Sequence, residues 1–273
     1  MKLYSRLLRQ IIIAIIFLTT FFLFGYGTKK ITETPAACDD RIKNGQEEGV
    51  DCGLFACGNY CEPDLDPPQV ISVQLIKVAK NDYDFVAEIS NPHKNFGSSE
   101  IVYELTIYNA SDKELLKREG TFYMLPGLNF YVILPALEIL DDSFKPEFII
   151  KSVRWQKLNS LEGMNFTVRN EKYTSYNGNE SNFDAGVINE SNFDFDRVDV
   201  SVVVRGQGGK IIAVNRTEIS TFSARTERHF RVTWPFFVKG TIAEIEVKLA
   251  TNLFENSNFI KNYGSETEKF QIY

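Results

Sequence analysis

Phe85–Asn91 (FVAEISN) and Phe183–Asn189 (FDAGVIN) are two copies of one pattern, 98 residues apart, and this repeat decides the fold. A second matched pair, Phe130–Pro135 (FYVILP) and Phe230–Pro235 (FRVTWP), recurs at a spacing of 100 residues. A period near 100 residues suits one small β-sandwich per copy. The sequence therefore predicts two tandem sandwiches that fold independently, at residues 69–158 and 160–252.

The segments between the matched blocks alternate apolar and polar residues. The clearest is 198–205, where Val198, Val200, Val202 and Val204 alternate with Asp199, Ser201, Val203 and Arg205; residues 103–108 and 244–249 behave alike. A period of two predicts strands with one buried face. No amphipathic helix of convincing length is present, so we expect an all-β protein with antiparallel sheets.

Short motifs in the repeats point to a family. The first copy has Asn91-Pro92, Leu105–Asn109 (LTIYN) and Met124–Gly127 (MLPG). The second keeps Asn189 but departs from the other two motifs. Each copy resembles the FxLYD type of small immunoglobulin-like sandwich, and the resemblance implies that fold without implying a reaction.

An uncharged run, Ile11–Gly27, lies near the N-terminus, with Lys2, Arg6 and Arg9 before it and Lys29-Lys30 after it. As a helix it would cover roughly 25 Å, the short end of what a bilayer core requires. The positive-inside bias then predicts a signal-anchor at 11–27, with residues 1–10 cytoplasmic and the rest extracytoplasmic, in the cell envelope. A cleaved signal peptide ending at Gly27 is the alternative.

The exported part is acidic. The chain carries a net charge of −6, and its first 30 residues hold five basic side chains and no acid, which leaves −11 for residues 31–273. Nucleic-acid binding requires a basic face, and none is visible. We expect no nucleic-acid partner.

All four cysteines, Cys38, Cys52, Cys57 and Cys61, lie within residues 28–61, which we interpret as a linker and cysteine-rich module. Outside the cytoplasm such a cluster predicts two disulfides, with three connectivities open. A four-thiolate zinc site is the alternative. A proline-rich linker at 62–68 follows the module, and residues 253–273 form a C-terminal tail.

The module also carries oxygen donors of the kind that calcium binds, Asp40, Asn44, Glu47 and Asp51. A solvated acidic turn around Gly45 and Gly49 is the simpler interpretation. The segment resembles a motif, approximately C-x-D-G-I-x-N-G-x-E-x-G-V-D-C-G-G-x-C-x-x-C, found beside the anchor of uncharacterised bacterial single-span envelope proteins. Arg41 stands where that motif has its first glycine.

Catalytic signals are absent from the sequence. His93 and His229 show no metal-ligand spacing, and no nucleophile motif is present. Gly206–Lys210 is expected to be a hairpin turn, and Trp155 and Trp234 to be core residues. We therefore expect a non-enzymatic binding or scaffolding protein with no cofactor except possible calcium, and with a protein or glycan partner. An accessory or degenerate subunit of a cell-wall enzyme is the alternative.

Overall fold

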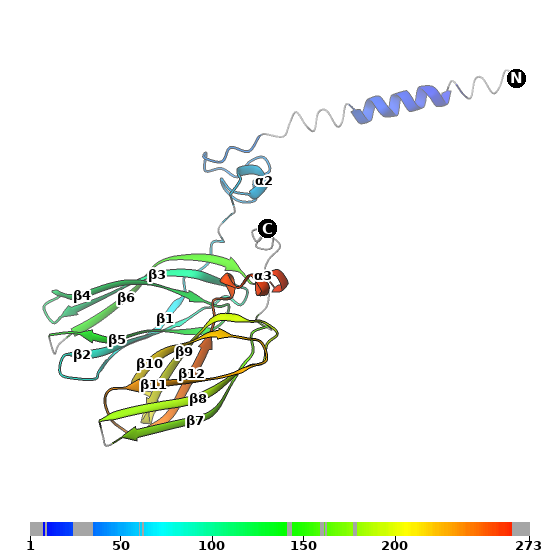
Figure 1. Cartoon of the computed structure of the whole chain (residues 1–273). Coiled ribbons are helices and arrows are strands. Elements are labelled where there is room, and N and C mark those ends of the chain that lie inside the picture. The colour runs from blue at the N-terminus through cyan, green and yellow to red at the C-terminus, as the bar shows by residue number, and fades with distance from the viewer. Residues whose placement is uncertain are drawn as a thin grey trace. The chain divides into compact units, whose positions relative to one another are not determined.

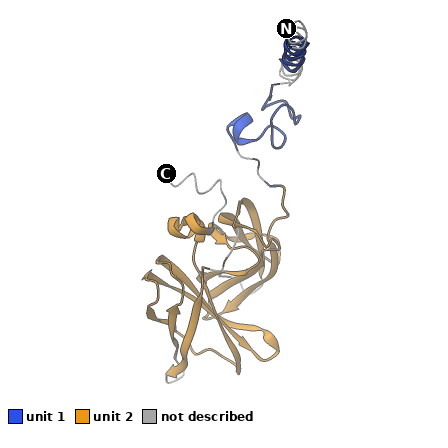
Figure 2. Ribbon diagram, turned by 90° about the vertical axis from the view of Figure 1, so that its right-hand side faces the viewer, with its two compact units in different colours: residues 1–63 blue, residues 64–273 orange. Residues whose placement is uncertain are grey.

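The computed structural model describes residues 8, 10–23, 35–59, 61, 63–140, 144–158, 161, 163–176 and 179–263. It divides the chain into two compact units, Met1–Pro63 and Asp64–Tyr273, coloured separately in Figure 2. Much of the predicted cytoplasmic segment 1–10, residues 24–27 of the predicted span, and residues 159–160 at the boundary of the predicted sandwiches lie outside the described residues.

The first sandwich consists of six antiparallel strands in two three-stranded sheets (Figure 1). One sheet has the order β1-β2-β5 and the other β4-β3-β6. The strands are β1 (Gln69–Lys77), β2 (Asp82–Ser90), β3 (Phe96–Asn109), β4 (Glu114–Met124), β5 (Asn129–Glu138) and β6 (Phe144–Lys157).

The second sandwich repeats this topology strand for strand. Its sheets have the orders β7-β8-β11 and β10-β9-β12, so each strand corresponds to the one six places earlier. The strands are β7 (Phe166–Tyr176), β8 (Glu180–Asn189), β9 (Phe195–Gly206), β10 (Ile211–Phe222), β11 (Glu227–Trp234) and β12 (Ile242–Ala250), with a 3-10 turn η1 (Gln207–Gly209) between β9 and β10. The all-β prediction and the hairpin at Gly206–Lys210 are confirmed.

The two sheets of each sandwich enclose an apolar core. Phe85 and Phe183 occupy matching places in β2 and β8, and both are buried. Val198, Val200, Val202 and Val204 of β9 are all fully buried against the facing sheet, as their alternation predicts. Trp234 is also buried, and its indole N–H donates to the carbonyl of Val214 at 2.8 Å.

A buried asparagine closes the same turn in both copies. Asn91 directly follows β2 and Asn189 ends β8, and each side-chain oxygen accepts the amide two residues later. Each side-chain NH2 then donates to carbonyls from the next strand and from the end of β4 or β10. Because a buried carbonyl without a partner is costly, this one side chain fixes three segments of its sandwich.

The prolines of the two sequence blocks do not occupy matching places, since Pro135 directly follows the partner of Phe85, whereas Pro235 lies three residues after the partner of Phe183. Both belong to or follow an edge strand, where a missing N–H is tolerated. Pro235 directly follows β11, whereas Pro135 lies inside β5 at an irregularity in the β2–β5 pairing. There Ala136 has a positive φ of 55° and donates its amide to the buried carboxylate of Asp84 at 2.9 Å. The second copy has Asn182 at the position of Asp84, and its NH2 donates to Glu180.

Replacing Asp84 by asparagine should stabilise the protein at neutral pH. Burial raises the pKa of Asp84, with a further increase from Asp82, although the Ala136 amide lowers it. Because the folded pKa lies above the unfolded value of about 3.9, the free energy of unfolding falls as pH rises through this window and stays reduced above it.

Asp84→Asn removes that loss, so the variant should match the wild type near pH 3 and exceed it at pH 7. Urea denaturation at both pH values measures the difference. The exposed Asp112→Asn is the control and should show no such pH-dependent gain. A variant that is less stable than the wild type at pH 7 would contradict the expectation.

A hydrophobic interface joins the two sandwiches. Val86 of β2 and Tyr131 and Ile133 of β5 form one buried cluster with Val203 of β9 and two residues of β10, Ile211 and Val214. The outer face of sheet β1-β2-β5 therefore packs on the outer face of sheet β10-β9-β12. The prediction that Val203 lies on an exposed face was wrong, because this second layer covers it.

Phe130 also lies at this junction. It is half-buried and packs against the cores of both sandwiches, whereas Phe230 is buried within the second core alone. The two phenylalanines do not occupy matching places, because Phe130 pairs with Ile89, whereas Phe230 pairs with Ala185, the counterpart of Ala87. Phe130 therefore contributes to both cores, which two independently folding sandwiches would not require. The second core also includes Tyr123 and Leu125 of the first sandwich.

Part of the predicted C-terminal tail is packed. A 3-10 turn, η2 (Leu253–Glu255), and a short helix, α3 (Ser257–Tyr263), follow β12. Leu253, Phe254 and Phe259 are buried in the second core. Residues 253–263 therefore belong to the second sandwich, and a fragment ending at 252 would expose part of its core.

In the first unit, residues 10–23 are helical, and a short helix, α2 (Leu54–Cys57), lies among the cysteines. Across the described residues, no helix combines the length and the hydrophobicity that a bilayer crossing needs.

Candidate functional site

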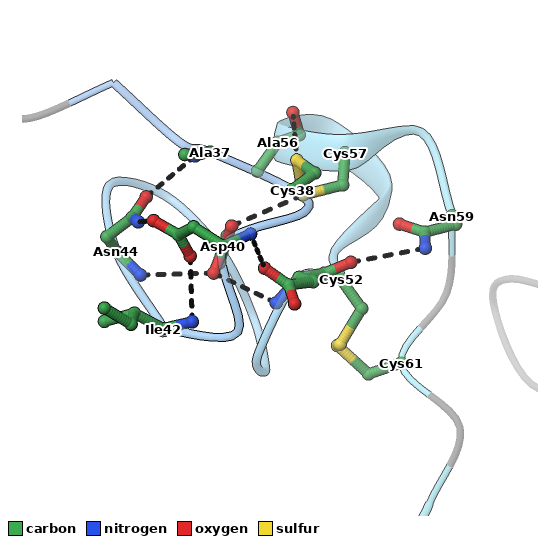
Figure 3. Close-up of a disulfide and its surroundings, with 12 residues drawn as sticks. Ala37, Cys38, Asp40, Ile42, Asn44, Cys52, Ala56, Cys57, Asn59 and Cys61 are labelled. Atoms are coloured by element: carbon green, nitrogen blue, oxygen red, sulfur yellow. Dashed lines mark hydrogen bonds between the residues drawn. A yellow bond between two sulfur atoms is a disulfide. The ribbon is translucent and has the colours of Figure 1, made fainter.

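The cysteine-rich module is held by two interleaved disulfides, Cys38–Cys57 and Cys52–Cys61, with Cα–Cα separations of 5.6 and 5.0 Å (Figure 3). The prediction of two disulfides is confirmed, and this connectivity is one of the three left open. Since all four sulfurs are bonded in pairs, the module offers no thiolate for the alternative zinc site.

Gly49 shows why this loop needs a glycine. A Cβ at position 49 would lie 2.6 Å from the sulfur of Cys52 and 2.8 Å from that of Cys61. These separations are too short for non-bonded atoms, so any side chain at Gly49 would displace the second disulfide.

The four predicted calcium ligands lie in one network, but they bind protein groups. Asp51 accepts the amides of Asp40 and Arg41. Asp40 accepts the amide of Ile42 and the side-chain NH2 of Asn44 (Figure 3). The Asn44 oxygen accepts the amide of Ala37.

Glu47 is the buried member of the set, and one of its oxygens accepts the amides of Asn44 and Asp51. These bonds give all four side chains a structural role in a segment too short to form a core. Calcium binding stays a prediction, with an affinity in the extracellular range of about 10⁻⁴–10⁻³ M. Calorimetry with millimolar calcium tests it, and absence of heat would contradict it.

Arg41 stands in an unfavourable backbone conformation, with φ of 62°. A non-glycine residue in this left-handed region costs about 1–2 kcal/mol, whereas glycine adopts it freely but loses more entropy on folding, about 0.5–1 kcal/mol. Arg41→Gly should therefore stabilise the module by about 0.5–1 kcal/mol, since the amide that binds Asp51 is retained.

Hydrogen exchange of the module amides measures this gain as slower exchange. Asp39→Gly is the matched control, because Asp39 is exposed and is not among the positive-φ residues, so glycine there should speed exchange. Faster exchange in Arg41→Gly would overturn the argument.

The histidines and Trp155 do not form a site in the described residues. His229 is exposed, and His93 is half-buried with its Nε2 2.9 Å from the carbonyl of Asp66. The His93 ring meets the half-buried Trp155 edge-to-face at 4.9 Å. Trp155 is thus packed at the end of the first sandwich, not fully inside its core as we expected.

A polar crevice opens along the interface between the sandwiches and is lined by residues of both. Tyr123 of β4 donates its hydroxyl to Asp199 of β9 at 2.8 Å, and Arg197 binds the other oxygen of Asp199 at 3.2 Å. Burial and the neighbouring Asp199 carboxylate raise the pKa of Tyr123, so its hydroxyl stays protonated.

A second polar group crosses the interface nearby. Arg205 of β9 donates to the hydroxyl of Tyr131 at 2.8 Å and lies 3.3 Å from Glu246 and 3.8 Å from Glu88. Tyr131 in turn donates to Glu246 at 2.9 Å. The crevice walls are therefore fixed relative to each other by hydrogen bonds as well as by apolar packing.

Sequence reasoning missed the crevice residues. Tyr123, Asp199 and Arg216 come from separate strands, and no local spacing links them. The one available signal was Val202-Val203-Val204, since three consecutive apolar residues in a strand indicate burial on both faces.

No protein-family model matches the chain, and no curated protein matches it. Among solved structures, a glycosyl hydrolase family 2 member from Bacteroides cellulosilyticus DSM 14838 is similar, with 7% identity and a TM-score of 0.21. The match covers 63% of this chain and 28% of that chain. At this level the similarity supports no statement about activity.

Proposed function

We propose that this chain is a membrane-anchored binding or scaffolding protein of the bacterial cell envelope, without catalytic activity of its own. Residues 11–27 would anchor it, and the disulfide module and the two sandwiches would lie outside the cytoplasm. The two disulfides support an oxidising compartment, since cytosolic thiols are kept reduced.

The observation that carries the binding role is the interface between the sandwiches. Two copies of one fold pack through buried residues and hold a crevice lined by polar side chains at fixed positions. Two sandwiches packed in this way can present a preformed binding surface. The partner would be a protein or a glycan of the envelope.

We further propose that each sandwich is immunoglobulin-like, of the FxLYD type. Two three-stranded antiparallel sheets per copy and the buried asparagine at the end of β2 and β8 support this assignment.

Membrane fractionation of the full-length protein tests the anchor. The protein should sediment with membranes and resist alkaline carbonate extraction. A variant with Ile15→Lys and Leu18→Lys, which places two charges in the predicted span, should be lost from that fraction. A soluble wild-type protein whose N-terminus is Thr28 would refute the anchor.

Crosslinking in intact cells tests the binding role. The full-length protein should capture one recurrent envelope component, and a partner identified in this way should be lost when the crevice is blocked by substitution. Hydrolysis of envelope polymers by the purified protein would contradict the non-enzymatic assignment.

A further inference from the structure

The crevice between the sandwiches has the size of a single six-membered ring. Its cavity volume is about 130 Å³, and its walls come from β3, β4 and β5 on one side and from β9 and β10 on the other. A cavity of roughly 150 Å³ accommodates one benzene ring in another protein. The crevice therefore admits one ring or the end of a longer chain.

The lining suits a ring that has both apolar faces and hydroxyl groups. Tyr103 and Tyr123 are buried, with exposed fractions of 5% and 6%, and present small aromatic areas to the crevice. Thr121, Ser201 and Thr217 supply hydroxyls. Tyr103 reaches this position because the facing residue is Gly120, where a Cβ would lie 2.5 Å from its hydroxyl. Contact with a small aromatic area together with hydrogen bonds to hydroxyl groups is chemistry that sugars satisfy.

The charge of the lining is opposite to that of the protein as a whole. Arg197, Arg216 and Asp199 leave an excess of one positive charge, in a chain with a net charge of −6. Asp199 is already bound by Tyr123 and Arg197, and Arg197 also lies 3.9 Å from Glu218.

Arg216 is the group that remains for a ligand. It is exposed, it lines the crevice, and its guanidinium makes no ion pair within the described part of the chain. A guanidinium binds a carboxylate through two parallel hydrogen bonds. The lining thus favours a ligand that carries a carboxylate over a neutral one.

We propose that the crevice binds a sugar ring bearing a carboxylate, of the uronic-acid class, with Arg216 holding the carboxylate and Tyr103 and Tyr123 contacting the ring. This inference rests on the proposed binding function and specifies the chemistry of its glycan partner.

Saturation-transfer NMR on the full-length protein in nanodiscs tests this proposal with two probes, D-glucuronate and D-glucose, which differ in the carboxylate at C6. Glucuronate should show saturation transfer and bind at least tenfold more tightly than glucose. Equal binding of the two sugars, or no transfer to glucuronate, would overturn the proposal.

Two variants locate the site. Arg216→Gln should weaken glucuronate binding at least tenfold, while Arg228→Gln, at an exposed arginine of β11, should leave it unchanged. Thr121→Trp places a large side chain at an exposed position of the crevice wall and should abolish glucuronate binding without changing charge. Unchanged binding in both Arg216→Gln and Thr121→Trp would place the sugar elsewhere and reject the proposal.

The proposed function can fail separately from this inference. Loss of sedimentation with membranes would reject the anchor while leaving glucuronate binding intact. Conversely, if the protein captures a protein partner but does not bind glucuronate, only the proposed sugar site is rejected.

Discussion

Replacing Asn189 by alanine should cost the second sandwich about 3–5 kcal/mol of unfolding free energy. The side chain is fully buried, and it satisfies the carbonyls of Phe193, Phe222 and Ser223 and the amide of Ser191. Each buried polar group left without a partner costs about 1–3 kcal/mol, and alanine would leave several.

Asn192→Ala is the matched control for this experiment. Asn192 lies three residues further along the same turn, but it is exposed, and its side chain accepts hydrogen bonds from the side chain of Arg225. Its replacement should change stability by less than about 0.5 kcal/mol. Equal effects of the two substitutions in urea denaturation would show that the Asn189 network does not hold the turn.

The second large effect is expected at the interface. Val203→Asp would place a carboxylate among the buried side chains of Val86, Tyr131 and Val214. An uncompensated buried charge destabilises by about 3–5 kcal/mol. Because Val203 faces away from its own core, the substitution should separate the sandwiches before it unfolds either.

Calorimetry distinguishes separation from unfolding. The wild type should unfold in one transition, because its sandwiches share buried surface, and Val203→Asp should show two. Leu140→Asp is the control, since Leu140 is 79% exposed, and it should keep the single transition. A wild type with two independent transitions would restore the original prediction of independent units.

The repeat and the alternation were enough to predict the strands and their shared topology. They carry that information because a strand with one buried face must alternate, and two copies of one sequence pattern adopt one fold. The same logic failed at Val203, since alternation describes a strand and its own core but not a second body that covers the outer face.

The candidate site was less predictable than the fold. The sequence placed the cysteines in disulfides, but their pairing depends on the path of the loop, which Gly49 and the Asp51 carboxylate shape through contacts distant in sequence. Arg216 could not be recognised at all. A lone exposed arginine can be recognised as a candidate ligand-binding residue only when the opposite wall of the crevice, which the other sandwich supplies, is known.

The contact between the two copies joins different faces of the repeat, so it is a head-to-tail contact that a third or fourth copy could in principle extend into a filament. The face that each copy leaves uncovered prevents such growth, because it carries charged side chains. At the places of Val86 and Ile133, the second copy has Asp184 and Arg231, which form an ion pair at 2.6 Å.

The first copy shows the complementary change. Lys117 stands where the second copy has Val214, and it binds Glu104 at 2.9 Å. Both outward surfaces thus carry paired charges where the inner pair carries apolar side chains. Growth by stacking stops after one step, which makes this architecture a closed pair and not the first unit of a polymer.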